Sequence, residues 1–411
     1  MIAGGGVAVR RTPEGIVGFA GLSTCGRVWL CPVCNAKIMA QRALEVGAVL
    51  AWAAEHHYLV VWGSLTVHHT ADSRLRKEGW LPADPFDVDP GPLPDRFRPV
   101  PRGDRVREPG SKYRSHRDQP FGLLDVKTNA WAYLASGRTW KDLQAVEMVE
   151  MDGHPEGCPS SCTTVHKVAV DTGRDGIVGT IRAAEITVGS NGWHPHFHPI
   201  VIVRGSAALA GKVAEVVVRR WVEGVRRTGH RADYGNGAQK MTVLASENSF
   251  HLLNQYVTKG TYRPDKLALE ATHSQGKTDL NRHGKGRAAA TQSHWAILNE
   301  AETGDVASIS KWWHLEEASH GHRIITWSRG IRDFAGLGVE ATEEEIAARE
   351  VGTAEDTVCV ITAEGWAMVR DHPGVMAEIL DMLAQGGWAA LRQLLGNLEI
   401  PFHTLDELAS V

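Results

Sequence analysis

The chain has 411 residues, enough for two or three domains that each bury a hydrophobic core. Hydrophobic residues make up 43% and charged residues 22%, and no apolar run reaches the roughly 18 to 20 residues that a membrane helix needs. Residues 1–11 lack the charged start and apolar centre of a secretory signal. We therefore expect a cytoplasmic protein that does not enter the membrane.

The formal net charge of −4 is divided unevenly along the chain. Residues 334–411 carry fourteen Asp and Glu but only three Arg, so the part that precedes them is net positive. Lys and Arg outnumber the acids within residues 204–240 and 256–287. Basic regions of this kind are typical of nucleic-acid binding, although solvated helix faces account for the charge equally well.

Periodic segments alternate with segments that lack a period. Ala36–Glu55 has apolar residues at helical spacing, and Tyr58–Thr70 is the β-branched and aromatic run of a buried strand. Residues 82–120 are rich in Pro, Arg and Asp without periodicity, which predicts an insert or a loop. A helix is expected around Phe121–Met148.

The following region predicts a sheet with flanking helices. An acidic, mostly helical tail ends the chain. The order of elements predicts an α+β fold in which helices cover one face of an antiparallel sheet. We expect strands at Val178–Gly189, His194–Arg204 and Lys240–Ser246. We expect helices at Ser206–Arg227, between the second and third strands, and at Ser249–Gly260.

Three histidines alternate at the start of the second of these strands. They are His194, His196 and His198 in "GWHPHFHPIVIV". Residues two apart share a face of a strand, so the three imidazoles are expected on one face. A single histidine would most simply be a hydrogen-bonded core or surface residue, whereas three at this spacing favour metal binding.

An Asn-Gly pair at residues 191–192 predicts a two-residue hairpin turn between the two strands. This turn places Glu185 opposite His198 and Thr187 opposite His196. A carboxylate therefore joins the imidazoles on one face. Such nitrogen and oxygen ligands suit a divalent metal that keeps open positions for a substrate oxygen.

Tyr256 and Lys259 lie three residues apart in "SFHLLNQYVTKGTYR", a predicted helix, and so project from one face. A phenol beside a metal-bound phosphate can act as a nucleophile, and a nearby ammonium can stabilise the phenolate or the phosphoryl charge. Taken alone, the pair is more simply explained by packing and a solvated charge. Its position after a metal-binding strand favours a functional role.

Five cysteines fall into two groups that suggest zinc. Cys31-Pro-Val-Cys34 is a zinc-knuckle turn, and Cys25 lies six residues before it. A second pair, Cys158 and Cys162, has histidines on either side in "HPEGCPSSCTTVH". One joint site is the simplest arrangement, two separate sites are the alternative, and thiols without metal also remain open.

Taken together, the motifs resemble the rolling-circle replication initiators of the HUH endonuclease superfamily, of the type carried by actinobacterial plasmids. The matching segments are "WGSLTVHH", "HPHFHPIVIV" and "QYVTKG", in the family's order, and "TCGRVWLCPVCNAKI" near the N-terminus. They extend from Cys25 to Tyr262. In one departure, Leu252 stands where some relatives carry a glutamate that activates water.

The resemblance implies a central antiparallel sheet of five strands that presents the histidine pair, with the tyrosine helix beside it. It also implies that Mg²⁺ or Mn²⁺ assists attack by Tyr256 on a DNA phosphodiester, which gives a 5′-phosphotyrosyl link and a 3′-OH primer. His196 and His198 carry over as metal ligands, Glu185 as the acidic ligand and His194 as a lesser candidate.

The implied partners are plasmid origin DNA, single-stranded or supercoiled, and the host helicase and polymerase. Candidate DNA-binding residues are Thr66 of the first motif and a basic set from the long helix and its end. This set consists of Arg219, Arg220, Arg226, Arg227 and Arg231.

We expect three regions along the chain. Residues 20–57 form a cysteine-rich segment with structural Zn²⁺ and a helix. Residues 58–290 form the nicking domain, with an insert at about 71–165. Residues 291–411 form a C-terminal region with the acidic helical tail.

Other functions compete with plasmid replication. A conjugative relaxase or a transposase shares the nicking chemistry. A metal-dependent oxygenase also uses His-x-His with Glu, but the long helix after Arg204 argues against the β-barrel that it needs. A zinc-dependent DNA-binding protein without catalysis would leave the histidine strand and Tyr256 unexplained.

Overall fold

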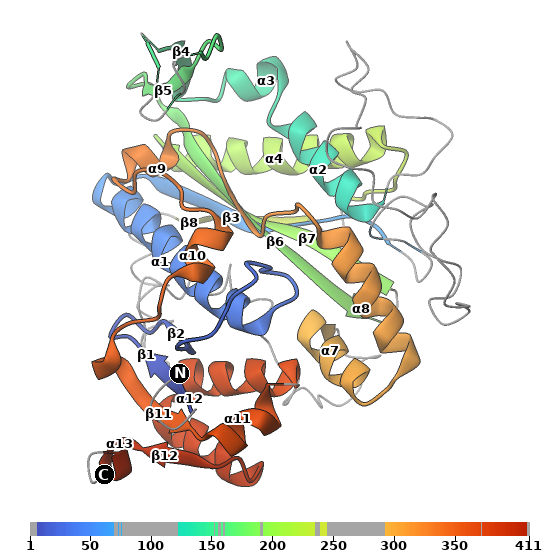
Figure 1. Ribbon diagram of the computed structural model, residues 1–411. Coiled ribbons are helices and arrows are strands. Elements are labelled where there is room, and N and C mark those ends of the chain that lie inside the picture. Colours follow the sequence, from blue (N-terminus) through green and yellow to red (C-terminus); the bar gives the residue numbers. More distant parts are fainter. Residues whose placement is uncertain are drawn as a thin grey trace.

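The computed structural model describes residues 6–69, 73, 75, 122–151, 153–154, 158, 161–189, 192–234, 239–244, 292–370 and 372–408. Figure 1 shows a central sheet with helices above and below it. The strands are β1 (Val7–Arg11), β2 (Val17–Phe19), β3 (Leu59–Thr66), β4 (Val146–Glu150), β5 (Lys167–Asp171), β6 (Gly176–Gly189), β7 (Gly192–Arg204), β8 (Gln239–Leu244), β9 (Gln292–Ser293), β10 (Ile325–Trp327), β11 (Thr357–Ile361) and β12 (Phe402–Thr404).

Helices connect these strands and cover the sheets. They are α1 (Pro32–Glu55), α2 (Leu123–Leu134), α3 (Gly137–Lys141), α4 (Ala207–Arg227), α7 (His294–Glu302), α8 (Val306–Ser319), α9 (Ile331–Phe334), α10 (Glu343–Ala348), α11 (Ala363–Val369), α12 (Pro373–Asn397) and α13 (Leu405–Leu408), with the short 3₁₀ helix η3 (Ala354–Asp356).

The main sheet has the order β10-β6-β7-β3-β8, and β9 also pairs with β6. Every neighbouring pair in it is antiparallel. The histidine strand β7 is therefore the middle strand of the five. The described fold is mixed α and β with antiparallel sheets, as the sequence predicted.

The β6–β7 hairpin has a different register from the one predicted. Gly189 pairs with Gly192, so Gly192, with a φ of 81°, begins β7 and does not lie at the centre of the turn. Glu185 consequently lies opposite His196, not opposite His198. Because the error is two residues, one full period of a strand, the predicted residues still share one face.

Helices cover both faces of the main sheet, so the expectation of helices on one face is wrong. On one face, the ring of Phe197 lies against Trp131 of α2 and Trp221 of α4, at centroid distances of 6.1 and 6.0 Å. On the other face, the absence of a side chain at Gly179 admits Ile331 of α9. In Figure 1, α2 and α4 lie above the sheet and α1 lies below it.

The helix predicted around Phe121–Met148 is interrupted. Helix α2 ends at Leu134, and Gly137, with a φ of 74°, starts the short helix α3 before the chain enters β4. A positive φ suits glycine and breaks a helix. Within the proposed insert of residues 71–165, α2 is thus a core element that packs against α4.

The two ends of the described chain share a second, smaller sheet. Its order is β12-β11-β1-β2, so the C-terminal strand β11 pairs with the N-terminal strand β1. The strands β9 and β10, which follow residue 291, belong instead to the main sheet. The core beneath the small sheet includes Val7, Val9, Val17, Phe19, Val33, Cys359, Ile361, Ile379, Leu380, Leu391 and Leu395.

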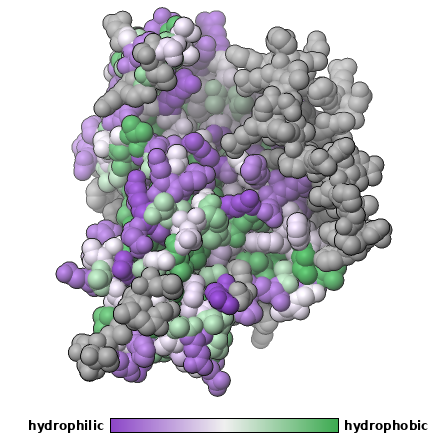
Figure 2. Space-filling model, viewed as in Figure 1, coloured by the Kyte–Doolittle hydropathy of each residue, from purple (hydrophilic) through white to green (hydrophobic). Residues whose placement is uncertain are grey.

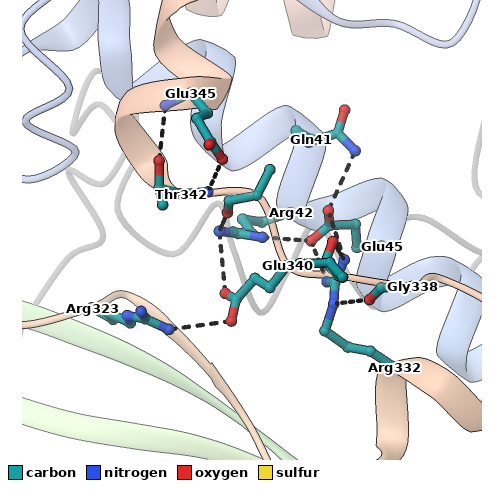
Figure 3. Close-up of polar contacts among 11 residues, drawn as sticks. Gln41, Arg42, Glu45, Arg323, Arg332, Gly338, Glu340, Thr342 and Glu345 are labelled. Carbon is teal, nitrogen blue, oxygen red and sulfur yellow. Dashed lines mark hydrogen bonds and ion pairs between the residues drawn. The ribbon is translucent and has the colours of Figure 1, made fainter. Parts of the chain in front are cut away.

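Buried charges join α1 to the C-terminal region (Figure 3). Glu45 accepts hydrogen bonds from Arg42 at 2.7 Å and from Arg332 at 2.9 Å. Arg42 also donates to the carbonyl oxygen of Ala341 and pairs with Glu340. Burial by itself would raise the pKa of Glu45, but hydrogen bonds from Arg332 and Arg42 outweigh it and lower that pKa.

Within the described residues, no helix combines the length and the apolar character that crossing a membrane requires. Hydrophilic and apolar residues are interspersed on the face shown in Figure 2.

Candidate metal centre

Three side chains converge on the face of the main sheet opposite α2 and α4. Nε2 of His196 lies 2.5 Å and Nε2 of His198 lies 2.8 Å from the same oxygen, Oε2 of Glu185. The pairing of β6 with β7 sets Glu185 directly opposite His196, and His198 follows two residues later on the same face. The predicted set of three ligands is therefore assembled by one hairpin.

The carboxyl group of Glu185 is held ionised although it is buried. Burial alone would raise its pKa, but hydrogen bonds from His196 and His198 outweigh burial and hold the pKa well below its usual range. A negative charge among imidazole rings in a buried position is a favourable environment for a cation.

The donor set fits a divalent transition metal. Two imidazole nitrogens and one carboxylate oxygen occupy one side of a metal and leave other positions open for a substrate oxygen. Mg²⁺ prefers oxygen ligands, so a site with two imidazoles fits Mg²⁺ less well than a transition metal.

His194, the lesser candidate, lies outside this group of three ligands. Its ring stacks on His69 at 4.5 Å between centroids and lies 5.0 Å from the ring of His196. Burial, followed by the charges of His196 and His69, lowers the pKa of His194 to about 4. His194 is therefore a neutral imidazole near pH 7 and extends the row of rings beside the ligands.

The first motif lies beside the candidate metal ligands. Thr66 of β3 pairs with His196 of β7, and the ring of Trp62 stacks on His198 at 5.9 Å. The side chain of Gln239 on β8 accepts a hydrogen bond from the backbone N–H of Thr66. Strands β3 and β7 thus contribute residues to one face, and Gln239 of β8 holds the end of β3 through the backbone of Thr66.

His294 is a buried histidine close enough to Glu185 to feel its charge, and the sequence analysis did not identify it. Its side chain is 0% exposed, and among the described residues neither ring nitrogen has a hydrogen-bond partner. Burial lowers the pKa of His294 to about 3, with the charge of Glu185 opposing that shift. The rings of Trp29 and Trp295 lie 6.3 and 4.2 Å away. Its local sequence has no period that marks it.

The expected nucleophile lies outside the described residues. The predicted helix Ser249–Gly260, with Tyr256 and Lys259, falls entirely within residues 245–291, as does Leu252. The roles of these residues stay predictions.

Among the candidate DNA-binding residues, Arg220 is corrected by the structure. Its guanidinium is buried and donates to the carbonyl oxygens of Leu134, Tyr133 and Ser136 at 2.9, 2.6 and 2.8 Å. These bonds satisfy the C-terminal end of α2 and leave Arg220 unsuited to phosphate. The exposed members of the set are Arg219, Arg226, Arg227 and Arg231.

The first cysteine group gathers where α1 begins. The Sγ atoms of Cys25 and Cys34 are 3.7 Å apart, and the backbone N–H of Cys34 donates to Sγ of Cys31 at 3.4 Å. A hydrogen bond from Cys31 lowers the pKa of Cys34 to about 5, although burial opposes the shift. A thiolate, the form that binds metal, is therefore favoured at Cys34.

The second cysteine pair forms a separate group. Cys158 and Cys162 gather with His154 and His166, apart from the three N-terminal cysteines. The joint site that seemed simplest is therefore wrong, and the alternative of two groups describes the structure. The spacing could not decide this, because it does not say where residues 154–166 lie relative to residue 25.

Comparisons with known proteins found two similar curated proteins. The chain is 29% identical over 402 residues to Protein rep of Streptomyces lividans, which covers 89% of this chain and 76% of that protein. This similarity supports a Rep-type protein.

A second relative has an unrelated name. Over 359 residues, 78% of this chain and 66% of the relative, the chain is 30% identical to a Neomycin resistance protein of Streptomyces cyanogenus. Nothing in the structure explains that name. No protein-family model and no solved structure matches the chain.

Proposed function

We propose that the chain is a plasmid rolling-circle replication initiator of the HUH type, which nicks and rejoins DNA at an origin. The observation that carries the proposal is the convergence of Glu185, His196 and His198 on the middle strand pair of the main sheet. The similarity to Protein rep of Streptomyces lividans supports the same conclusion.

Each residue has a defined role in this proposal. Glu185, His196 and His198 hold Mn²⁺ or Mg²⁺, and a metal there supplies positive charge to a phosphate oxygen. The phenolic oxygen of Tyr256 forms a bond to phosphorus while the bond from phosphorus to the 3′ oxygen breaks. Lys259 stabilises the negative charge that develops. The products are a 5′-phosphotyrosine and a free 3′-OH.

DNA would reach the site along the face that carries Thr66 and the histidine row. Exposed Arg219, Arg226, Arg227 and Arg231 supply further phosphate contacts. They belong to α4 and its end, which cover the other face of the sheet, so the DNA would have to pass around a sheet edge. The host helicase and polymerase would then extend the 3′-OH.

The cysteine group of residues 25, 31 and 34 would bind structural Zn²⁺ in the same proposal. The distance of 3.7 Å between two of its Sγ atoms equals about one edge of a tetrahedron with zinc–sulfur bonds of about 2.3 Å. Zinc would fix residues 25–31 against the start of α1.

The ligand assignment is tested with single substitutions. His196→Ala and His198→Ala are each expected to abolish Mn²⁺-dependent nicking of single-stranded DNA. Each variant keeps only two of the three proposed ligands, which are too few to hold the metal in an open site. Each substitution also removes a hydrogen bond to the buried carboxylate of Glu185 and should lower the unfolding temperature, so circular dichroism must show that each variant keeps its secondary structure. His403→Ala, an exposed histidine on β12 of the small sheet, serves as the control.

Near-normal nicking by both ligand variants would refute the metal assignment. Absence of nicking in the wild-type protein with either ion would favour a zinc-dependent DNA-binding protein without catalysis. A conjugative relaxase or a transposase would give the same nicking result and differ in the DNA sequence cut.

A further inference from the structure

A two-stranded ribbon, formed by β4 and β5, extends from the main sheet near α3. Figure 1 shows it at the top of the molecule, beyond the helices that cover the sheet. The two strands pair only with each other. No described residue between 146 and 171 is buried, and Met148, Val149, Val168 and Val170 are between 39% and 46% exposed.

A ribbon of this kind does not stabilise itself. An isolated pair of strands is at best marginally stable in water because it has no core to bury. Segments that lack a core use disulfides or metals in its place. The ribbon therefore needs fixed points at its base and at its tip.

Its base is fixed by ordinary contacts. Arg204 at the end of β7 donates to both carboxylate oxygens of Asp171 at 2.9 and 2.6 Å and to the carbonyl oxygen of Arg174 at 2.9 Å. Ala169 approaches Gly330, where a side chain would not fit. These contacts hold the end of the ribbon that is nearest the sheet.

Its tip is where four ligand atoms meet. Sγ of Cys158 lies 3.5 Å from Nδ1 of His154 and 3.4 Å from Nε2 of His166, and Sγ of Cys162 lies 3.4 Å from the same Nε2. All four ligand atoms lie within 4.8 Å of one another. In a tetrahedral zinc site, bonds of about 2.3 Å to sulfur and about 2.0 Å to nitrogen separate the two by about 3.5 Å.

We propose that His154, Cys158, Cys162 and His166 bind one Zn²⁺ in a closed structural site that fixes the tip of the ribbon. Four protein ligands fill a tetrahedron and leave no position for substrate, which distinguishes this site from the three-ligand group on β6 and β7. The ligands follow one another at intervals of four residues, so the site needs no other part of the chain. It does not depend on the proposed nicking.

Zinc would supply the stability that the ribbon lacks. Metal that binds only the folded arrangement adds its binding free energy to folding. The backbone N–H of Met151 donates to the carbonyl oxygen of His166 at 2.9 Å. The ligand His166 is therefore hydrogen-bonded to the residue that follows β4, directly beyond the paired strands. Removing zinc should loosen residues 146–171 and leave β6 and β7 in place.

Zinc content of the reduced, full-length protein tests the site. A variant with Cys158→Ser and Cys162→Ser is expected to hold one zinc per chain fewer than the wild type. A variant with Cys31→Ser and Cys34→Ser should keep the zinc of the ribbon. Thr163→Ala, an exposed residue between the ligands, should not change the zinc content.

Equal zinc content in the wild type and in the Cys158→Ser, Cys162→Ser variant would overturn the proposal. Loss of the same single zinc from both double variants would also overturn it, because that pattern belongs to one joint site.

A pair of substitutions at His166 separates loss of a ligand from loss of folding. His166→Cys supplies another zinc ligand and should keep the metal, whereas His166→Ala should lose it. Amide hydrogen exchange should become faster at residues 146–171 in His166→Ala alone, with β6 and β7 unchanged. Full zinc content in His166→Ala, or faster exchange throughout the main sheet, would contradict a site confined to the ribbon.

Discussion

Lys127 of α2 is a deeply buried lysine beside the main core. Its Nζ lies 4.4 Å from the centre of the Phe197 ring, and only 2% of the residue is exposed. Burial, followed by the charge of Arg182, lowers the pKa of Lys127 to about 7, with Glu185 opposing. Burial of the charged form costs stability, and the ring of Phe197 offsets part of that cost.

Lys127 should make stability depend on pH. The lysine of the unfolded chain keeps a pKa near 10.5, so between about pH 7 and pH 10.5 the unfolded state binds more protons. The contribution of Lys127 to the free energy of unfolding should therefore rise with pH across that window. Its size is on the order of 1 kcal/mol for each pH unit.

Lys127→Met keeps the length of the side chain and removes the charge, so the rise should disappear. Urea unfolding of the wild type and the variant at pH 7 and pH 9 measures the difference. Lys141→Met, at an exposed position, is the matched control. If the free energy of unfolding differs between wild type and Lys127→Met by the same amount at both pH values, the lowered pKa of Lys127 is contradicted.

At the scale of elements, the strand patterns carried most of the information. Alternation in β7 predicted which residues share a face with Glu185, because a period of two is local. The predicted register was wrong because it placed the Asn-Gly pair at the centre of the turn. In the structure, Gly189 and Gly192 are the last paired residues of the hairpin. The long helix around Phe121–Met148 was overextended because the positive φ of Gly137 was not recognised.

The buried and the exposed arginines of α4 should behave differently on substitution. Arg220→Ala leaves the three carbonyl oxygens at the end of α2 without their donor, at a cost of about 2 to 4 kcal/mol in unfolding free energy. Replacement of exposed Arg226 and Arg227 by Ala should change stability by less than about 1 kcal/mol and weaken DNA binding instead.

Fluorescence anisotropy with a labelled single-stranded oligonucleotide, measured across salt concentrations, checks this contrast. The slope of log affinity against log salt should fall by about 1 for each arginine that contacts a phosphate. Unchanged binding by the Arg226→Ala, Arg227→Ala variant would remove α4 from the DNA-binding surface.

At the scale of the whole molecule, pairings between segments far apart in the chain could not be predicted from the sequence. Val7 of β1 pairs with Ile361 of β11, and neither segment carries a local mark of its partner. The same holds for Arg332, which reaches Glu45 of α1. The convergence of Glu185, His196 and His198 could be predicted because one hairpin holds all three residues, whereas the burial of His294 depends on a distant segment that folds against the sheet.

The proposed reaction requires that Tyr256, sixty residues after His196 in the chain, act at the same metal centre. Lys259→Ala should then slow the reaction by on the order of 10 to 10³-fold, as removal of a transition-state donor does. Tyr256→Phe should abolish the covalent product and keep DNA binding, and Tyr262→Phe should still form the product.

The most direct measurement is peptide mapping of the covalent adduct formed with a pool of random-sequence single-stranded oligonucleotides labelled at the 3′ end. With Mn²⁺ present, we predict a labelled nucleotide on Tyr256 in the wild-type protein, and no adduct in His196→Ala or His198→Ala. An adduct on another residue, or one that forms at the wild-type rate in either histidine variant, would contradict the account.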